Sequence, residues 1–496
     1  MSQQPAEHAP ESFFVAQLAE RAKQSSVAAP ATLASLVDNL SYLSGDELHL
    51  IKQAHAYATH AHDGQSRRTG HAYITHPTAV AHILSDMRMD PQTIMAALLH
   101  DVIEDSATNK QTLGEKFGES VAEIVDGVSK LSKIFSSRDE AQAENFQKMA
   151  LAMAKDIRVI LVKLADRVHN MRTIGVMSSA QRRRIAKETL DFYAPIANRL
   201  GIHTLKTELE DLGFKALYPL RADLIQQSVV AARGNRKELM EEIRDTITAA
   251  MNREGIAADV KAREKNSYSI YRKMKSKHKS FADIMDVFGF RIVVDQPDAC
   301  YRALGVVHNL YKPVTSRFKD YIAIPKINGY QSLHTSLFGM HGVPIEVQIR
   351  TKQMDAVADN GIAGHWLYKS DGDFDSNQQR ARQWTKDLLE LQKRAGDPLE
   401  FIESLKIDLF PGDVYVFTPR GDIMELPTGA SAVDFAYSVH TDIGNQCVAC
   451  RVDGKLAPLS QQLESGQRVE IITSKESRPN PDWLTFVVTS RARSAI

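Results

Sequence analysis

An adjacent histidine and aspartate, His100-Asp101, are followed one turn later by the acidic pair Glu104-Asp105. If this stretch is helical, His100 lies over Glu104 and Asp101 over Asp105, so one imidazole and three carboxylates share a surface. Like charges at this spacing repel, and a bound cation is the simplest way to relieve the repulsion. The stretch alone leaves two interpretations open: a metal site on a helix, or a helix end with solvated acids.

Two other polar residues in this half of the chain are candidate metal ligands. His76 precedes Pro77, which suits the first turn of a helix, and Asp166 interrupts an otherwise apolar helical face. Taken singly, each is more simply explained as a structural residue. Together with His100 and Asp101 they supply two imidazoles and two carboxylates, a donor set that suits Mn, Fe or Zn better than Ca.

A second group of chemically active residues lies further along the chain. Residues 343–351 alternate strictly, which predicts a strand with Glu346, Gln348 and Arg350 on one face. Another β-branched segment follows Asp286. If the two strands are neighbours, Asp286 and Glu346 form a Mg²⁺ platform for triphosphate chemistry.

The residues around this platform are strongly basic. Residues 261–279 hold many cations and a single acid, and we expect them on one helix. This stretch is either a solvated basic face or a polyphosphate site. Residues 317–334 add further cations and Tyr330, an aromatic side chain that can stack on a base. A Walker-type glycine-rich loop is missing from the sequence, which excludes a P-loop enzyme.

The elements that position these residues are expected to form roughly three domains in 496 residues. The apolar pattern is helical from 47 to 199, helical and charged in a solvated connector from 201 to 252, and rich in short strands from 413 to 473. Lys+Arg and Asp+Glu balance at 61 each, so anionic ligands must bind to local basic patches. With no signal segment or membrane span, we expect a cytoplasmic protein without a membrane partner.

The motifs resemble the RelA/SpoT family, which makes and destroys the alarmone (p)ppGpp. The segments that include RTG, YITHP, LLHDVIEDS, IVDGVSKL and LVKLADRVHNMRT are similar to its HD-type hydrolase domain. The segments RFKDYIA, NGYQSLHT, VQIRT and AGHWLYK are similar to its synthetase domain, and the last β-rich segment is similar to a TGS domain. The loop beginning Arg317-Phe-Lys319-Asp320 matches the basic version found in members with both activities.

The resemblance implies a role for each site residue. In the hydrolase domain it implies a Mn²⁺ site at His76, His100, Asp101 and Asp166. Glu104 and Asp105 would act at the attacking water, and the nucleotide would contact Arg67, Asn170 and Thr173. In the synthetase domain it implies Mg²⁺ at Asp286, with Glu346 as the base for the ribose 3′ hydroxyl. Substrate-binding positions there are Arg263, Lys265, Ser269, Lys273, Arg317, Lys319, Lys326, Tyr330, His334 and Gln348.

The expected fold class is multidomain: an all-α HD-type hydrolase, an α+β nucleotidyltransferase-like synthetase and a small β-grasp TGS domain. The expected boundaries are an N-terminal extension (1–44), the hydrolase domain (45–200), a helical connector (201–252), the synthetase domain (253–370), a helical linker (371–404), the TGS domain (405–475) and the start of a further helical regulatory region (476–496). We expect the chain to be truncated at its C-terminus.

The function that the resemblance implies is a Mn²⁺-dependent (p)ppGpp 3′-pyrophosphohydrolase, which releases pyrophosphate and leaves GDP or GTP. The attached synthetase would transfer pyrophosphate from ATP to GDP or GTP, and the TGS domain would contact tRNA, the ribosome or an acyl carrier protein. One alternative keeps the second domain as a nucleotide-binding regulator. Another is an RNA- or ribosome-associated binding protein in which neither site turns over.

Overall fold

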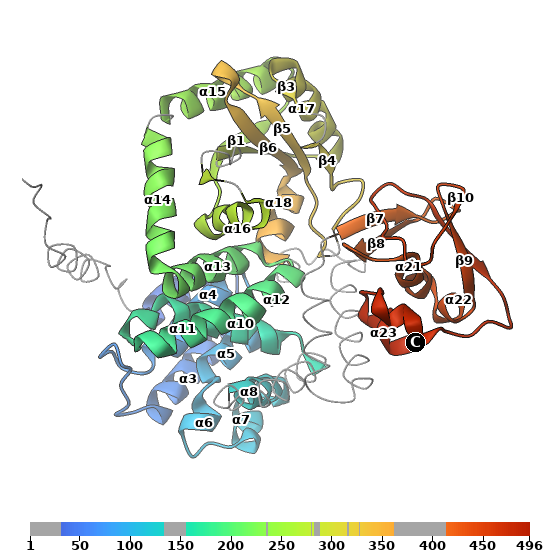
Figure 1. Cartoon of the computed structure of the whole chain (residues 1–496). Coiled ribbons are helices and arrows are strands. Elements are labelled where there is room, and N and C mark those ends of the chain that lie inside the picture. The colour runs from blue at the N-terminus through green and yellow to red at the C-terminus, as the bar shows by residue number, and fades with distance from the viewer. Residues whose placement is uncertain are drawn as a thin grey trace, which may run out of the picture.

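The computed structural model describes residues 31–132, 155–234, 237–278, 280–281, 288–314, 317–326, 328–361 and 413–496. Over these residues the chain forms a helical part, a mixed α+β part and a small β-rich part, coloured blue to green, yellow-green to orange, and red in Figure 1. The predicted multidomain fold class is confirmed. None of the described helices combines the length and apolar character that crossing a bilayer requires.

Several helices of the helical part begin at polar capping residues. Asp90 caps one of them by accepting the Thr93 N–H at 3.1 Å. The helices are α2 (Leu33–Asn39), α3 (Gly45–Ala61), α4 (Thr75–Asp86), α5 (Pro91–Leu99), α6 (Val102–Asp105), α7 (Lys110–Phe117), α8 (Glu119–Ser132), α10 (Arg158–Arg172), α11 (Ser179–Glu188), α12 (Ala194–Arg199) and α13 (His203–Leu217). A 3₁₀ turn (Ile174–Val176) follows α10, and a π-helix (Thr189–Tyr193) joins α11 to α12.

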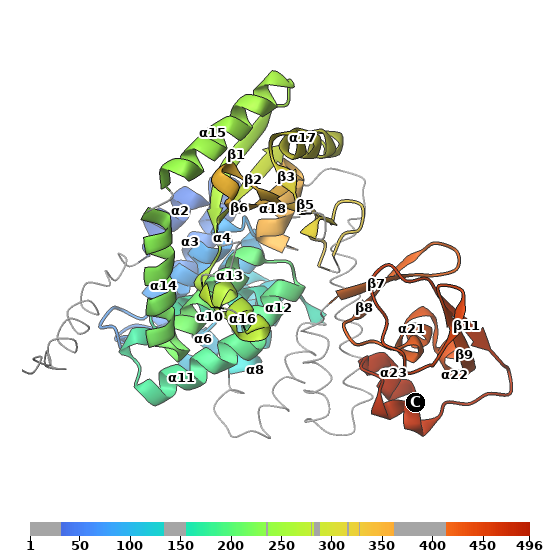
Figure 2. The same ribbon diagram turned by 45° about the horizontal axis from the view of Figure 1, so that its top comes forward.

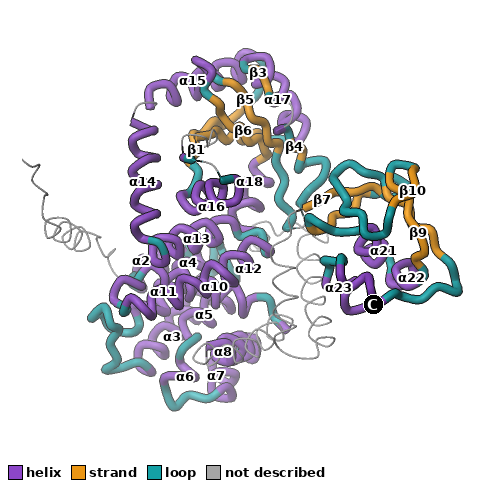
Figure 3. The backbone as a smooth tube through the Cα atoms, in the orientation of Figure 1, coloured by secondary structure: helices purple, strands orange, loops and turns teal. Residues whose placement is uncertain are grey.

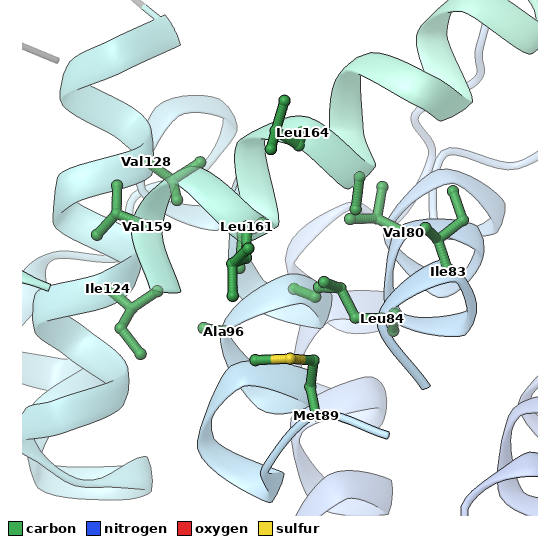
Figure 4. Packing of buried hydrophobic residues seen from close by; sticks show 14 of the residues in the cluster. Val80, Ile83, Leu84, Met89, Ala96, Ile124, Val128, Val159, Leu161 and Leu164 are labelled. Atoms are coloured by element: carbon green, nitrogen blue, oxygen red, sulfur yellow. The ribbon is translucent and has the colours of Figure 1, made fainter. Parts of the chain in front are cut away.

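One apolar core holds these helices together. Leu84 of α4, Ala96 of α5, Val128 of α8 and Leu161 of α10 all meet in it (Figure 4). Burying an aliphatic side chain stabilises the fold by roughly 1.5–3 kcal/mol. The core therefore fixes α4, α5 and α10, the helices on or beside which the candidate metal ligands lie.

Two expectations about the ends of this part are wrong. The predicted extension 1–44 includes α2, yet Leu36 and Leu40 are fully buried in the helical core. The predicted solvated connector includes α13, yet Leu205 and Leu209 pack into the same core. Surface charges obscured the apolar stripe of α13, whereas α2 is a short helix with one charged residue, Asp38.

The connector expectation also fails at its other end. After α13 come α14 (Pro219–Gly234) and α15 (Lys237–Arg253), and α14 runs along one side of the molecule between the helical and mixed parts (Figure 1). Ile243 and Ile247 of α15 are buried in the core of the mixed part. Leu220 and Leu224 are exposed on α14, but Ile225 and Val229 of the same helix are buried in that core, so α14 is only partly solvated.

The mixed part contains a sheet of order β1-β2-β6-β5-β3, with β4 paired to β5. Its elements are β1 (Ala258–Glu264), α16 (Ser267–Lys277), β2 (Phe288–Val294), α17 (Pro297–Leu310), β3 (Lys312–Pro313), β4 (Lys319–Asp320), β5 (Leu333–Phe338), a 3₁₀ turn (Met340–Gly342), β6 (Pro344–Thr351) and α18 (Lys352–Asn360). Strands β2 and β6 are parallel neighbours, as the predicted platform requires, with Gly289 opposite Glu346. A Cβ at Gly289 would lie 2.7 Å from the Glu346 carbonyl oxygen, which explains a glycine there.

The C-terminal part is a small β-rich module, seen as the separate orange strands beside the main sheet in Figure 3. Its elements are β7 (Asp413–Phe417), β8 (Ile423–Pro427), α21 (Ala432–Val439), α22 (Thr441–Asn445), β9 (Cys447–Val452), β10 (Lys455–Ala457), β11 (Val469–Thr473), a 3₁₀ turn (Pro481–Thr485) and α23 (Ser490–Ala495). The hairpin and the helix after it agree with the sequence prediction. Residues 476–496 pack onto the module, since buried Asp434 accepts the Thr489 N–H at 2.7 Å. The predicted linker 371–404 lies outside the described residues.

The helical and mixed parts meet at the turn between α12 and α13, and α13 also contacts α16 (Figure 2). Gly201 in this turn has a φ of +75°, and a Cβ there would lie 2.9 Å from the carbonyl oxygen of Asn328. The Asn328 side chain donates to the Asn198 carbonyl at 2.9 Å, and Thr204 donates to the Asp359 carbonyl at 2.8 Å. The loop that precedes Tyr330 is thus tied directly to the helical part.

Candidate active sites

The first candidate site lies where the start of α4, the junction of α5 and α6, and the middle of α10 converge. His76 Nε2 lies 3.3 Å from Asp166 Oδ1 and 3.7 Å from Asp101 Oδ2. His100 Nε2 lies 3.2 Å from Asp101 Oδ1. The structure therefore brings together all four side chains that the sequence analysis proposed as metal ligands.

The His100-Asp101 pair does not lie on a continuous helix, so that prediction is wrong. Helix α5 ends at Leu99, and α6 begins at Val102. The His100 imidazole explains the break, because its Nδ1 donates to the Ala97 carbonyl at 2.8 Å, where a continuing helix would place a backbone N–H. The same hydrogen bond fixes the ring with Nε2 facing the cluster.

The donor atoms of this cluster fit a divalent cation. His76, His100 and Asp101 each offer a ligand atom within 4.8 Å of one another. Asp166 is outside this group of three, but its Oδ1 lies 3.3 Å from His76 Nε2. His100 is fully buried, and its Nε2 makes no hydrogen bond within the described residues. This buried nitrogen faces a carboxylate at 3.2 Å, and once it loses its proton it offers a lone pair that a metal ion can bind.

The ionisation states also suit a cation. Burial alone would raise the pKa of the Asp101 and Asp166 carboxyl groups. The neighbouring charges have a larger effect: His100 lowers the pKa of Asp101, and Lys163 lowers the pKa of Asp166, in each case well below the usual range. Burial lowers the pKa of His76 despite the facing carboxylates. Burial also acts to lower the pKa of His100, but the negative charge of Asp101 has a larger effect and raises the pKa of His100 to about 9. The site therefore presents ionised carboxylates at neutral pH, and a bound metal would displace the His100 proton.

A hydrogen-bonded chain leads from this cluster to a predicted nucleotide contact. Asn170 donates its side-chain amide to Asp166 Oδ1 at 2.5 Å, and Arg67 donates to the Asn170 amide oxygen at 2.8 Å. Thr173 lies at the end of α10, and its hydroxyl is hydrogen-bonded to the His169 carbonyl at 3.1 Å. The structure thus links Arg67 and Asn170 to the ligand cluster, whereas Thr173 bonds back to its own helix.

Glu104 and Asp105 lie on α6, at the edge of the cluster. Glu104 is half-buried and Asp105 is exposed. The Tyr73 hydroxyl donates to Asp101 Oδ2 at 2.8 Å. Burial, Asp101 and Asp105 together raise the pKa of Tyr73, so Asp105 acts on the same hydroxyl that contacts the cluster. This chain of contacts places Asp105 close enough to influence the site.

Sequence reasoning missed three further residues of this site. Tyr73 contacts Asp101, Lys163 pairs with Asp166 Oδ2 at 2.8 Å, and His169 Nδ1 lies 2.7 Å from His76 Nδ1. All three lie inside the motifs that carried the resemblance. Their residue types gave no signal, because a buried tyrosine, lysine or histidine is more often structural than functional.

The second candidate site lies on the face formed by β6, β5 and β1. Glu346 Oε1 on β6 lies 3.4 Å from His334 Nδ1 on β5, and His334 Nε2 shares a hydrogen bond of 2.8 Å with the Tyr330 hydroxyl. Arg263 on β1 donates to Gln348 on β6 at 2.7 Å. The alternation of β6 therefore gathers a carboxylate, an imidazole, an aromatic ring and a cation on one surface.

Two of the lysines predicted to bind substrate, Lys319 and Lys326, lie beside this group. Lys326 Nζ lies 4.8 Å from the ring centre of Tyr321, and Lys319 Nζ lies 5.9 Å from it. The Tyr321 ring in turn contacts His334 edge-on at 5.3 Å. Tyr321, which the sequence analysis did not single out, therefore connects the lysines to the site.

Other predicted residues of this domain are less closely gathered. Residues 261–279 are not one basic helix, because Lys261 and Arg263 lie on β1 and only the later residues form α16. Ser269 and Lys273 lie on α16, which packs against α14 and α13, and Lys265 lies just before it. Arg317 is exposed in the loop before β4. The predicted Mg²⁺ ligand Asp286 lies outside the described residues.

Three protein-family models match the chain. An HD domain matches residues 54–203, a region found in RelA / SpoT proteins matches residues 262–373, and a TGS domain matches residues 414–473. The HD match includes all four candidate ligands of the first site, and an HD domain implies a bound divalent metal. The second match includes Glu346, His334 and Tyr330.

Several curated proteins are similar over most of this chain. The guanosine-3′,5′-bis(diphosphate) 3′-pyrophosphohydrolase of Vibrio cholerae and the bifunctional (p)ppGpp synthase/hydrolase SpoT of Escherichia coli are each 58% identical over 458 residues. Each match covers 92% of this chain and 65% of the relative's length. The GTP pyrophosphokinase of Myxococcus xanthus is 48% identical, with 92% of this chain and 61% of that protein covered.

Solved structures of small alarmone synthetases also match part of the chain. The small alarmone synthetase 1 of Bacillus subtilis bound to pppGpp is 24% identical, with a TM-score of 0.25, and covers 34% of this chain and 95% of that chain.

Proposed function

This chain belongs to the RelA/SpoT family, and we propose that its helical domain hydrolyses (p)ppGpp while its mixed domain synthesises it. The convergence of His76, His100, Asp101 and Asp166, with the buried His100 Nε2 directed at the carboxylates, is the observation that carries the hydrolase proposal. The contact between Glu346 on β6 and His334 on β5, on one face of the sheet, supports the synthetase proposal.

Mn²⁺ is the cation proposed for the first site, because two imidazoles and two carboxylates suit a first-row transition metal. When bound, it would polarise a phosphoryl oxygen and lower the pKa of a water. Lys163 would keep Asp166 ionised and oriented through its 2.8 Å contact. Tyr73 would do the same for Asp101 by donating to Oδ2.

The remaining residues of the first site would handle substrate and protons. Arg67, held by Asn170, would bind the anionic nucleotide close to the ligand Asp166. Glu104 and Asp105 would accept the proton of the attacking water. The 3′ oxygen of the nucleotide leaves with a proton as a hydroxyl, and the products are pyrophosphate and GDP or GTP.

In the second domain, Glu346 would accept the proton of the ribose 3′ hydroxyl of GDP or GTP. His334 would orient Glu346 from one side and hold the Tyr330 hydroxyl on the other, so that the Tyr330 ring can stack on guanine. Lys319 and Lys326 would stabilise the transferring diphosphate, while AMP leaves. Mg²⁺ on Asp286 would neutralise the ATP phosphates.

The remaining parts of the chain are proposed to regulate the two activities. Two opposing sites on one chain would run a futile cycle unless they are switched reciprocally. The contact of Asn328 with Asn198 and Gly201 supports such coupling, because it joins the loop before Tyr330 to the helical domain. The TGS module would bind a partner such as tRNA, the ribosome or an acyl carrier protein.

Paired incubations test the proposal. The protein with ppGpp and Mn²⁺ should release pyrophosphate and GDP, and Asp101→Ala should abolish this release. The protein with ATP, GDP and Mg²⁺ should form ppGpp and AMP, and Glu346→Gln should abolish that formation. Normal hydrolysis by Asp101→Ala would overturn the first assignment. Nucleotide binding without pyrophosphoryl transfer would instead make the second domain a regulator, and salt-dependent RNA binding without turnover would make the chain a binding protein.

A further inference from the structure

A histidine outside the candidate ligand set makes a close contact with one of its members. His169 lies on α10, three residues after Asp166, and its Nδ1 lies 2.7 Å from Nδ1 of His76. The two rings are tilted by 39° with their centres 4.8 Å apart. This is hydrogen-bond geometry between two imidazoles, and the roles of the nitrogens depend on which one carries the proton.

The position of His76 determines those roles when a cation is bound. Nε2 of His76 faces the carboxylates of Asp166, at 3.3 Å, and Asp101, at 3.7 Å, so Nε2 is the nitrogen directed at the site. A ligating nitrogen must offer a lone pair, so the ring proton must be on Nδ1. The acceptor within reach of that proton is Nδ1 of His169.

The other imidazole of the cluster is held in a different way. His100 donates its Nδ1 proton to the backbone carbonyl of Ala97 at 2.8 Å, which no substitution of a side chain can remove. His76 depends on the side chain of His169 for the same purpose. This difference makes the orientation of His76 testable by mutation, whereas that of His100 is built into the backbone.

The location of His169 supports a positioning role. Val168 and Met171 on either side of it are buried in the helical core, so α10 is held firmly. The same helix therefore supplies one ligand, Asp166, directly and orients another, His76, through His169.

We propose that His169 is a positioning residue that accepts the Nδ1 proton of His76, and thereby fixes the tautomer and ring orientation in which His76 binds the divalent cation. This inference rests on the proposed metal site of the hydrolase domain. It assigns His169 neither a contact with the cation nor a contact with the nucleotide.

The test measures Mn²⁺ affinity directly, from the electron paramagnetic resonance signal of free Mn²⁺ during a titration. His169→Phe keeps a planar ring and removes both nitrogens, and it should raise the dissociation constant by ~10–100-fold, the usual cost of losing such a partner. His169→Gln keeps a side-chain oxygen that can accept the proton, and it should recover most of this loss. Hydrolysis by His169→Phe should be restored by raising the Mn²⁺ concentration.

Two control variants distinguish the role proposed for His169 from the proposed metal site itself. His60→Phe changes an exposed histidine of α3 and should leave affinity unchanged. Asp101→Ala removes a proposed ligand and should abolish binding. If wild type binds no Mn²⁺, the metal site itself is wrong. The role of His169 is tested when the wild-type protein binds Mn²⁺ and the Asp101→Ala protein does not. In that case, an unchanged Mn²⁺ affinity of the His169→Phe protein overturns the role. A His169→Gln protein that binds Mn²⁺ as weakly as the His169→Phe protein overturns it as well. Should His169→Phe fail to fold, a loss of more than about tenfold in a folded His169→Gln protein overturns it.

Discussion

Asn170 donates its side-chain amide to Asp166 Oδ1 at 2.5 Å, and its own amide oxygen accepts from Arg67 at 2.8 Å. One side chain thus joins a proposed metal ligand to a proposed nucleotide contact. We expect Asn170→Ala to weaken both, raising the KM for ppGpp and lowering Mn²⁺ affinity by ~10-fold each, because both partners lose their orientation. Steady-state kinetics at saturating and limiting Mn²⁺ separate the two effects. No change in either quantity would contradict the linkage.

The division of labour around the His-Asp pair gives a second prediction. Glu104 follows the break in the helix and lies outside the group of proposed ligands. Glu104→Gln should therefore lower kcat for hydrolysis by ~10²–10⁴-fold, the usual contribution of a general base, while Mn²⁺ affinity stays within a few-fold of wild type. Glu115→Gln, which changes an exposed glutamate of α7, is the matched control. A large loss of Mn²⁺ affinity in Glu104→Gln would instead make Glu104 a ligand.

A third prediction concerns the dependence of stability on pH. Burial, followed by the charges of Lys206 and Arg263, lowers the pKa of His203 from 6.5 to about 3. The unfolded chain therefore takes up a proton at this histidine below pH 6.5 while the folded chain does not, so stability falls as pH drops. His203→Gln should reduce the fall in Tm between pH 7 and pH 5. Part of the decrease in Tm should remain in this variant, because the pKa of His169 is also lowered to about 3.

The control for His203→Gln is a substitution of a histidine that is exposed rather than buried beside cations. His60→Gln on the exposed side of α3 serves this purpose and should show the wild-type pH dependence. An equal fall in Tm for wild type and His203→Gln would show that His203 is not kept neutral at the contact between α13 and the mixed domain.

The contact between the two catalytic domains gives a fourth prediction. Gly201 and Gly255 both have positive φ, at +75° and +64°, but only Gly201 has a close neighbour, the Asn328 carbonyl. Alanine at either position should cost ~1–2 kcal/mol through the left-handed backbone. Gly201→Ala should in addition displace the loop before Tyr330 and raise the KM for GDP in synthesis, whereas Gly255→Ala should not. Equal KM values for the two variants would rule out an effect transmitted through this contact.

The candidate sites were more predictable from the sequence than the boundaries of the domains. Each of His76, His100, Asp101 and Asp166 has a structural explanation when taken singly, but together they form one donor set and lie in motifs that resemble a hydrolase family, so they could be proposed as metal ligands. The alternation around Glu346 likewise fixed which side chains share a face. By contrast, Leu205 and Ile243 lie in highly charged helices, and their burial depends on which neighbours fold against them. The burial of these residues is set by tertiary packing, which the local sequence pattern does not show.

The same distinction explains the residues that were missed. The break after Leu99 arises because the His100 ring takes the Ala97 carbonyl, which is a consequence of side-chain direction rather than of helix propensity. His169 matters because a histidine from another helix lies 2.7 Å away. Neither contact has a signature in the spacing of residue types along the chain.

The most direct test of two opposing activities on one chain is net ppGpp turnover in a single mixture of ATP, GDP, Mg²⁺ and Mn²⁺. The Asp101→Ala protein should accumulate ppGpp, because synthesis continues without hydrolysis. The Glu346→Gln protein should accumulate none and should destroy ppGpp that is added. Removal of added ppGpp by the Asp101→Ala protein at the wild-type rate would show that Asp101 is not needed for hydrolysis and would overturn the proposed hydrolase site.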